Sequence, residues 1–381
     1  MQSILSRLPS PSRLCSRLAK AFAMVLVAVA SVIAALPAHA DFEVTDVTGR
    51  KVVLAEPARR ILIDDGRYLV ALSLIHPDPV SVLSAWPKDI HRIGPELYEQ
   101  YRQKFPAIEQ LKQAGSSAGN FSVEQVLAAE PDLAIFSLQS MPTHDEIARI
   151  EAAGVSVAII DFFNQPLENL ESGMRLLGAV TGRAEQAETF VAFRRAHLDR
   201  IAQKIAADRS PRPRVFLEPH AARTDECCVS PGRGNIGNYI ELAGGENIGS
   251  AAIPSVTGTL NLEYVIATDP QVYVATGGPH MKGTNGLLIG PGYDADTVQK
   301  TLARVAARNG ISQLSAVRDG HVHGVAHQLL NSPLDVLTVE VLATWIRPDL
   351  FSDIDPEKTL EELNGRFLAV PLSGLNWDSL R

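Results

Sequence analysis

Along this chain, segments with strand-like spacing of apolar residues alternate with segments with helix-like spacing. Short apolar runs of four to six residues predict buried strands, and longer segments with apolar residues at helical spacing predict helices. Strands are expected at residues 60–64, 80–83, 133–136, 155–160, 214–217, 272–275 and 320–325, after a hairpin at 42–54. Helices are expected at residues 68–75, 96–105, 122–129, 143–153, 167–181, 184–207, 236–242, 262–267, 297–309, 335–346 and 357–364. Because strands that alternate with helices favour parallel sheets, the pattern predicts an α/β protein.

One helix–strand unit occurs twice. The sequence FSVEQVLAAEPDLAIF at residues 121–136 recurs as LNLEYVIATDPQVYVA at residues 260–275, so that Glu124 matches Glu263 and each copy has a Pro before its strand. A single repeat at this distance indicates two similar lobes rather than a solenoid, whose repeats are about 20–50 residues long. A cleft between two such lobes is a common place to hold a small molecule.

A long segment without Gly or Pro separates the two copies. Residues 184–207 keep apolar side chains at helical spacing and end at the sequence DRSPRP, which stops a helix. A helix of this length spans about 36 Å, and its position between the copies favours a rigid connector. The predicted organisation is a signal peptide at 1–40, an N-terminal lobe at 41–183, a linker helix at 184–208 and a C-terminal lobe at 209–381.

The first forty residues have the pattern of a secretory signal. A basic leader precedes an apolar core at residues 21–36, and Ala38-His39-Ala40 forms a small-x-small cleavage site before Asp41. The core is short for a membrane span, so cleavage is favoured over a retained anchor. We therefore expect a soluble protein in the periplasm.

Composition narrows the function further. Loss of residues 1–40 removes four basic and no acidic residues, so the formal net charge changes from −8 to −12. A mildly acidic chain without basic runs is a poor candidate for nucleic-acid binding. The mature chain keeps only Cys227 and Cys228, either as a vicinal disulfide or as two thiols, and the sequence leaves both alternatives open. No metal ligands are assigned, because no Cys or His partner lies at zinc-site spacing.

Two catalytic motifs are matched without their structural context. Residues 115–119 read GSSAG, which would make Ser117 the nucleophile of a secreted α/β hydrolase. That motif requires a strand directly before the Ser, and the preceding residues 109–114 are polar and helix-like, so a loop is favoured. Residues 232–237 read GRGNIG, but no strand ends just before them and no acidic residue follows about twenty positions on. We therefore assign no catalytic residues.

Several short motifs occur in a fixed order. They are VTGR at 47–50, PDL at 131–133, EAAGV at 151–155, LLG at 176–178, TGR at 181–183, AGGENI at 243–248 and AVRDGHV at 316–322. In this order and spacing, the chain resembles the class III periplasmic binding proteins, which capture iron–siderophore complexes, haem or cobalamin for ABC importers. The resemblance covers nearly all of the mature chain.

The resemblance implies an architecture and a role. The fold would be α/β, with two lobes that each contain a mainly parallel sheet and that are joined by one long linker helix. Closure around the ligand would then be small, in contrast to binding proteins with several flexible crossovers. The protein would be a monomer without catalytic activity or resident cofactor, and it would deliver a ferric siderophore to an ABC permease of the inner membrane. Glu124 and Glu263, one on each lobe, would dock on that permease. Haem and cobalamin are the alternative cargoes.

The ligand site is expected beyond the carboxyl ends of the strands, where ligands of open α/β sheets bind. That rule selects the loops at 64–68, 84–92, 137–141, 162–164, 218–223, 276–281 and 327–331. The predicted ligand contacts are Arg67, Tyr68, Trp86, Arg92, Gln139, Phe163, His220, Arg223, His280 and His327, with Arg233 and Tyr293 in nearby Gly-rich loops.

These side chains suit a bulky, partly aromatic anion. Aromatic faces cover apolar area, and Arg side chains pair with carboxylate or catecholate oxygens. A siderophore already fills the coordination shell of its iron, so the protein need supply no metal ligand. Bare-metal capture is the competing prediction, but it needs several converging His and carboxylates, and no such set is evident. Haem would require an axial Tyr or His, for which Tyr68, Tyr293, His220 and His280 are candidates.

Overall fold

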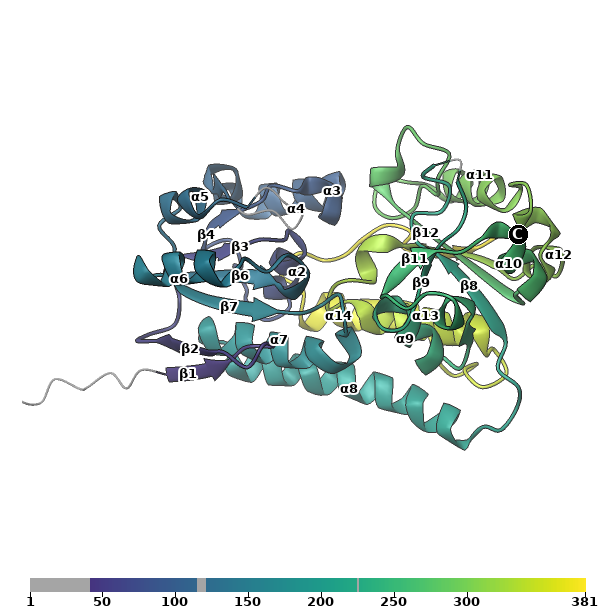
Figure 1. Cartoon of the computed structure of the whole chain (residues 1–381), viewed down its shortest axis with the longest axis horizontal. Helices are drawn as coiled ribbons and strands as arrows, with labels where there is room; N and C mark the ends of the chain where they lie inside the picture. The colour runs from purple at the N-terminus through teal and green to yellow at the C-terminus, as the bar shows by residue number, and fades with distance from the viewer. Residues whose placement is uncertain (1–41, 115–120, 225) are drawn as a thin grey trace, which may run out of the picture. The chain divides into compact units, whose positions relative to one another are not determined.

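The computed structural model describes residues 42–114, 121–224 and 226–381. The predicted signal peptide at 1–40 and the GSSAG motif with Ser117 lie outside the described residues. From Glu43 onward the chain forms one compact unit, in which two separate five-stranded sheets are the centres of two lobes (Figure 1).

The sheet of the N-terminal lobe has the strand order β5-β4-β3-β6-β7, and all its pairings are parallel. Its strands are β3 (Ile61–Ile63), β4 (Leu83–Trp86), β5 (Lys112–Gln113), β6 (Leu133–Ser137) and β7 (Ser156–Ile160). The central strands β3 and β6 are buried along their whole length, as expected for a parallel sheet covered on both faces. The predicted hairpin forms a small separate sheet of β1 (Phe42–Thr45) and β2 (Lys51–Leu54).

The sheet of the C-terminal lobe has the order β10-β8-β12-β13-β14, and only β14 runs antiparallel. Its strands are β8 (Arg214–Glu218), β10 (Glu246–Asn247), β12 (Val272–Gly277), β13 (Val322–Ala326) and β14 (Trp377–Ser379), and β9 (Val229–Pro231) pairs separately with β11 (Thr257–Thr259). The α/β prediction with two mainly parallel sheets is therefore confirmed.

Helices surround both sheets. The α-helices are α2 (Arg67–Ser73), α3 (Ile90–Ile93), α4 (Pro95–Lys104), α5 (Val123–Ala128), α6 (His144–Ala152), α7 (Pro166–Val180), α8 (Ala184–Ala207), α9 (Asn235–Leu242), α10 (Leu262–Thr268), α11 (Ala295–Ala306), α12 (Ser315–Arg318), α13 (Asp335–Ile346) and α14 (Pro356–Arg366). Short 3-10 helices are η1 (Pro106–Gln110), η2 (Leu138–Ser140), η3 (Ile248–Ala251), η4 (Pro279–Met281), η5 (Ile311–Gln313) and η6 (His327–Leu329).

The repeated unit of the sequence forms the same structure twice. In each copy a short helix, α5 or α10, leads through a Pro into a buried strand, β6 or β12. The residue before that Pro has left-handed backbone in both copies, with φ of 49° at Glu130 and 46° at Asp269. Such a conformation is disfavoured for residues other than Gly by about 1–2 kcal/mol, and its occurrence at matched positions shows that both lobes use one turn.

Helix α8 joins the two lobes, as the sequence predicts. It packs against α7 on the N-terminal side and against α9 and α13 on the C-terminal side, and it lies along both lobes in Figure 1. The exact lobe boundaries at 41–183, 184–208 and 209–381 stay predictions.

A buried ion pair fastens α8 to the C-terminal lobe. Arg194 on α8 donates from Nε to Asp335 Oδ1 at 2.9 Å and from Nη2 to Oδ2 at 2.6 Å. Tyr239 on α9 donates its hydroxyl to Asp335 Oδ2 at 2.9 Å. Neither charged side chain is more than 1% exposed. The three groups therefore satisfy one another in the interior, which a buried charge requires.

The C-terminal segment also returns to the N-terminal lobe. The backbone N–H of Ala369 donates to the carbonyl of Ser73 at 2.9 Å, and Gln100 donates to Ser373 Oγ at 3.0 Å. Phe367 packs on α8, with its ring centroid 5.1 Å from that of Phe193. This second connection between the lobes was not predicted from the sequence.

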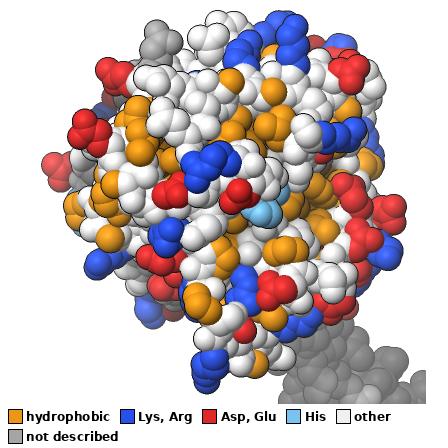
Figure 2. All heavy atoms as spheres, turned by 90° about the vertical axis from the view of Figure 1, so that its right-hand side faces the viewer, with side chains coloured by type: hydrophobic (Ala, Val, Ile, Leu, Met, Phe, Trp, Pro, Cys, Tyr) orange, Lys and Arg blue, Asp and Glu red, His pale blue; other side chains and the backbone are white. Residues whose placement is uncertain are grey.

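Two smaller expectations can also be compared with the structure. The thiols of Cys227 and Cys228 are joined in a vicinal disulfide, which decides between the two alternatives that the sequence left open. Acidic and basic side chains are interspersed on the face shown in Figure 2, and the described side chains form no continuous basic patch there.

We expect Asp335→Ala to lower the free energy of unfolding by about 3–5 kcal/mol, because the variant leaves Arg194 buried without its counter-ion. Urea unfolding would measure the loss. Asp353→Ala is the control, since Asp353 pairs with Arg200 and Lys204 at the surface, where ion pairs contribute little. Similar losses in both variants would contradict a structural role for the buried pair.

Candidate functional site: a cationic cavity between the two sheets

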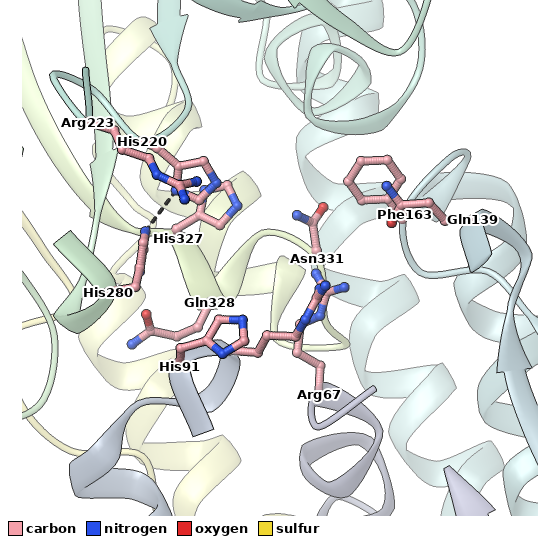
Figure 3. A pocket seen from close by; sticks show the side chains of 11 residues that line it. Arg67, His91, Gln139, Phe163, His220, Arg223, His280, His327, Gln328 and Asn331 are labelled. Carbon is pink, nitrogen blue, oxygen red and sulfur yellow. Dashed lines mark hydrogen bonds between the residues drawn. The ribbon is translucent and has the colours of Figure 1, made fainter. Parts of the chain in front are cut away.

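A cavity of about 500 Å³ lies among the loops that follow the carboxyl ends of the strands in both sheets. Its lining is Arg67, His91, Arg92, Gln139, Phe163, His220, Arg223, His280, His327, Gln328 and Asn331 (Figure 3). Every one of these residues follows a strand end, so the cavity lies where the topology of open α/β sheets places ligands.

The lining includes eight of the twelve residues that the sequence proposed as ligand contacts: Arg67, Arg92, Gln139, Phe163, His220, Arg223, His280 and His327. Tyr68 and Trp86 point into the core of the N-terminal lobe instead. Tyr68 is 3% exposed and packs edge-on against Phe162, and Trp86 is fully buried and stacks on Tyr98. Both lie on the buried side of their element. Burial of a large aromatic ring there is more favourable than its exposure in the cavity.

Arg233 and Tyr293 also lie outside the cavity lining. The Arg233 guanidinium donates from Nε to the carbonyl of Ser250 at 3.1 Å, and Tyr293 is half-buried. Three lining residues, in contrast, were not proposed from the sequence. His91, Gln328 and Asn331 lie in the loops 84–92 and 327–331, so the strand-end rule selected their segments but not their side chains.

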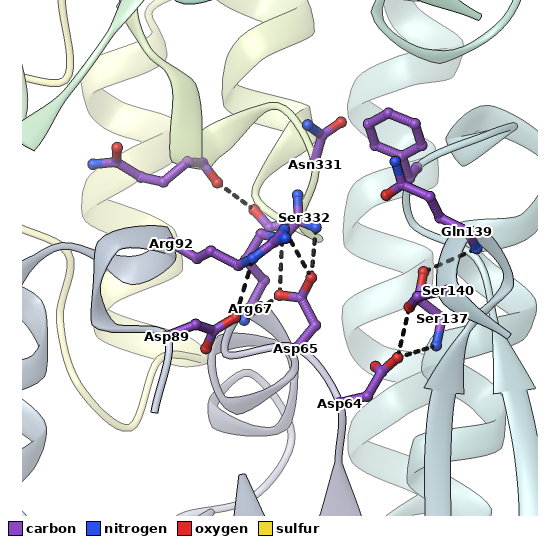
Figure 4. A network of polar contacts seen from close by, with 12 residues as sticks. Asp64, Asp65, Arg67, Asp89, Arg92, Ser137, Gln139, Ser140, Asn331 and Ser332 are labelled. Carbon is purple, nitrogen blue, oxygen red and sulfur yellow. Dashed lines mark hydrogen bonds and ion pairs between the residues drawn. The ribbon is translucent and has the colours of Figure 1, made fainter. Parts of the chain in front are cut away.

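The N-terminal wall is built around a buried carboxylate (Figure 4). Asp65 accepts two hydrogen bonds from the Arg67 side chain, at 2.9 and 2.6 Å, and one from Arg92 at 3.2 Å. Burial alone would raise the pKa of Asp65, but the charges and hydrogen bonds of Arg67 and Arg92 lower it to about 2. Arg92 also pairs with Asp89 at 3.1 Å. These contacts hold both guanidinium groups at the cavity wall.

The aromatic wall is positioned by Asp161 at the end of β7. Its carboxylate accepts hydrogen bonds from the backbone N–H groups of Phe163, Asn164 and Gln165 at 2.7–3.0 Å. Asn235 of the C-terminal lobe donates its side-chain amide to the carbonyl of Phe163 and its backbone N–H to that of Asn164. These bonds fix the Phe163 loop directly against α9.

Three histidines form the opposite wall. His220, His280 and His327 follow β8, β12 and β13, which are neighbours in the sheet. His220 Nδ1 lies 2.8 Å from His280 Nε2, and the ring centroids of His220 and His327 are 3.8 Å apart. His327 Nδ1 lies 2.8 Å from the hydroxyl of Thr276. The sequence spacing of 107 residues between the first and last ring gave no sign of this cluster.

The histidine cluster is uncharged near neutral pH. Burial lowers the pKa of His220 and of His280 to about 4 in each case, and nearby positive charge, including Arg223, adds to the shift. Burial and the other two rings hold the pKa of His327 well below its ordinary value. The cavity therefore presents guanidinium charges and neutral imidazoles, and no described carboxylate lines it.

Neither a metal centre nor a membrane span is evident in the described part of the chain. Across residues 42–114, 121–224 and 226–381, no group of three or more His, Cys, Asp or Glu side chains is arranged to hold a metal ion. In the same residues no helix combines the length and apolar character needed to cross a membrane.

Asp64, behind the cavity wall, is a buried acid that forms no ion pair with a described residue. Its Oδ2 accepts hydrogen bonds from Ser137 N at 3.0 Å and Ser140 Oγ at 2.8 Å, whereas its Oδ1 has no partner among the described residues. Burial and the adjacent charge of Asp65 raise the pKa of Asp64 to about 7. Since the unfolded chain releases this proton near pH 4, the folded state binds the extra proton between about pH 4 and 7. Stability therefore falls as the pH rises through that window.

We expect Asp64→Asn to flatten this dependence. Relative to the wild type, the free energy of unfolding should rise by up to about 1.4 kcal/mol per pH unit between pH 4.5 and 7. Urea unfolding at four pH values would show the trend. Asp65→Asn is the contrast, because it removes a paired carboxylate and should destabilise throughout this range. Parallel curves for the wild type and Asp64→Asn would contradict the assignment.

Comparison with known proteins identifies the fold and the family. Among solved structures, the chain is similar to the TroA-like periplasmic binding protein FepB from Veillonella parvula, with a TM-score of 0.79, 24% identity, and coverage of 89% of this chain and 99% of that chain. It is also similar to the molybdate-bound periplasmic protein MolA of Haemophilus influenzae, with a TM-score of 0.66, 17% identity, and coverage of 88% and 100%.

A third similar structure is a periplasmic haem-binding protein from Pseudomonas aeruginosa, with a TM-score of 0.55, 23% identity, and coverage of 77% and 94%. At these identities the structures show a shared fold. The comparison with curated proteins gives no match. The family model described as "Periplasmic binding protein" matches residues 75–328, which is more than half of the chain. The chain therefore belongs to the family of periplasmic binding proteins.

Proposed function

We propose that this protein captures a ferric siderophore complex in the cavity and delivers it to an ABC permease of the inner membrane. The family consists of binding proteins that hold small ligands for ABC permeases, and its members are not enzymes. The leader at residues 1–40 supports export to the periplasm, where such a cargo would be met.

The main support for this proposal is the positive charge of side chains that line the cavity. Arg67, Arg92 and Arg223 line the cavity, and the carboxylates near the first two lie behind them. Guanidinium groups form paired hydrogen bonds with carboxylate or catecholate oxygens. Phe163 adds an apolar face for an aromatic part of the ligand. The lining thus matches an anionic chelate better than a bare cation, which three Arg side chains would repel.

Haem is the second candidate, and one observation favours it. The imidazoles of His220, His280 and His327 lie at the cavity and are uncharged, which is the state in which a His can ligate haem iron. Tyr68 and Tyr293, the other axial ligands considered from the sequence, lie outside the lining. A Soret band after incubation with haemin would identify this cargo.

A titration against ferric siderophores of the catecholate, hydroxamate and carboxylate classes tests the proposal. At least one ferric complex should bind in one-to-one stoichiometry. Arg223→Gln should weaken that binding about tenfold or more, because a charged hydrogen bond contributes about 1.5–3 kcal/mol. Isothermal titration calorimetry would measure both affinities.

Arg233→Gln serves as the comparison, because Arg233 lies on the same lobe but outside the cavity lining. Its affinity should equal that of the wild type. An equal loss in both Arg variants would place the ligand elsewhere, and the absence of any ferric siderophore complex among the bound ligands would refute the proposed cargo.

Docking on the permease is proposed for one Glu of each lobe. Glu124 lies in the first turn of α5 and Glu263 in the first turn of α10, the two helices of the repeated unit. Both side chains are exposed, and Glu124 forms an exposed ion pair with Arg149 at 2.7 Å. A basic residue on a permease could take the place of Arg149 in this pair at little cost, because surface ion pairs are weak.

We expect the double variant Glu124→Arg/Glu263→Arg to abolish uptake of the cargo while its affinity for the ligand stays at the wild-type value. Uptake in whole cells and calorimetry on the purified protein would separate the two effects. The matched control is Glu168→Arg/Glu357→Arg, which reverses exposed first-turn charges of α7 and α14. Normal uptake in the first double variant, or equal losses in both, would show that docking does not use these two residues.

A further inference from the structure

The histidine cluster of His220, His280 and His327 is the most unusual group in the cavity. Three imidazoles that follow three neighbouring strands lie close together, with ring centroids 3.8–6.1 Å apart. One nitrogen of each ring has a partner: His220 and His280 bond to each other, and His327 bonds to Thr276. The second nitrogen of each ring has no hydrogen-bond partner among the described residues and is available to the cavity. Figure 3 shows the rings gathered with Arg223 on one wall.

Positive charge faces this cluster from several elements. Arg223 follows His220 in the same loop, Arg67 extends from α2, and Arg92 extends from α3. His91, beside Arg92 on α3, adds an imidazole whose pKa is lowered by burial and by the charge of Arg92. The nearby described carboxylates are already engaged by Arg side chains. Asp65 is bound by Arg67 and Arg92, and Asp89 also pairs with Arg92. Glu218, at the end of β8, is held by Arg308 and Tyr273.

Protonation of the three imidazoles is therefore unfavourable while the cavity is empty. A proton on any of the three rings would stand beside another ring and near a guanidinium group, with no described carboxylate in the lining to compensate. Burial adds to this repulsion, which agrees with the pKa of about 4 for His220 and His280. A bound anion would reverse the situation, because an opposite charge within about 4–6 Å typically raises a pKa by 1–3 units.

We propose that the cavity binds its cargo as an anion together with a proton, which the cluster of His220, His280 and His327 takes up as the anion enters. This inference rests on the proposed function and narrows the cargo. A ferric tris-catecholate is a trianion, whereas a ferric tris-hydroxamate is uncharged, so the structure assigns the catecholate or carboxylate class. The proton places a positive charge on the cluster and gives it one further N–H that can donate a hydrogen bond to the anion.

The sign of the pH dependence follows from this coupling. The cluster holds a proton more tightly in the complex than in the free protein, so affinity rises as the pH falls below the pKa of the complex. The rise continues until the free protein is also protonated, near pH 4. Uptake of one proton corresponds to about tenfold in affinity per pH unit within that window.

Calorimetry in two buffers of different ionisation enthalpy counts the protons. At pH 6 the probes are a ferric tris-catecholate, a ferric tris-hydroxamate, haemin and molybdate, each titrated into the full mature chain. We expect the tris-catecholate to bind at least tenfold more tightly than the tris-hydroxamate, with uptake of about half to one proton. His220→Gln/His280→Gln/His327→Gln should lose the uptake and flatten the affinity profile between pH 5.5 and 7.5.

Two controls keep this test independent of folding. His321→Gln changes an exposed imidazole of the same lobe outside the cavity and should retain the proton uptake. If the triple variant unfolds, the single variant His280→Gln takes its place. Circular dichroism checks its fold, and its proton uptake should be lower than that of the wild type. Subtracting the proton uptake of the variant from that of the wild type also cancels the protons that the probe itself exchanges.

The outcomes separate this inference from the proposed function. Tight binding of the tris-catecholate without proton uptake, or with uptake that survives in the triple variant, overturns the inference and leaves siderophore capture intact. Preference for the uncharged tris-hydroxamate also overturns it. Proton-coupled binding of haemin or molybdate, without any ferric siderophore, supports the inference and refutes the proposed cargo. Failure of every probe to bind, the tris-hydroxamate included, overturns both.

Discussion

The cavity depends on one constraint, which is that the carboxyl ends of two separate parallel sheets must face each other at a fixed separation. Helix α8 provides this constraint, because it packs on both lobes and is secured by the buried pair of Arg194 and Asp335. The bonds between Asn235 and the Phe163 loop hold the two edges together at the cavity itself. The geometry of the lining is thus set by contacts that lie outside it.

Within that frame, the placement of carboxylates determines what the cavity can hold. Asp65 lies behind Arg67 and Arg92, so it orients both guanidinium groups without occupying the lining. The wall formed by the C-terminal lobe adds Arg223 and uncharged imidazoles. The resulting surface offers three guanidinium groups and further hydrogen-bond donors, and no described carboxylate lines it.

Local sequence signals predicted the frame of this site well. The repeat of residues 121–136 at 260–275, the uninterrupted helix at 184–207 and the strand-end loops all depend on neighbouring residues along the chain. The direction of individual side chains depends on distant packing and was harder to predict. Trp86 turns into the core against Tyr98, and the three histidines meet only because β8, β12 and β13 are adjacent in the sheet. The spacing of residues along the sequence does not show which strands are adjacent in the sheet, and so it does not predict these contacts.

The return of the C-terminal segment to the N-terminal lobe bears on how this chain matures. Ser73 completes its hydrogen bonds with Ala369 and Val370, so this edge of the first lobe is completed by the last part of the polypeptide. A nascent chain lacks these two bonds until synthesis is nearly finished. The contact therefore couples the completion of one lobe to the arrival of the other.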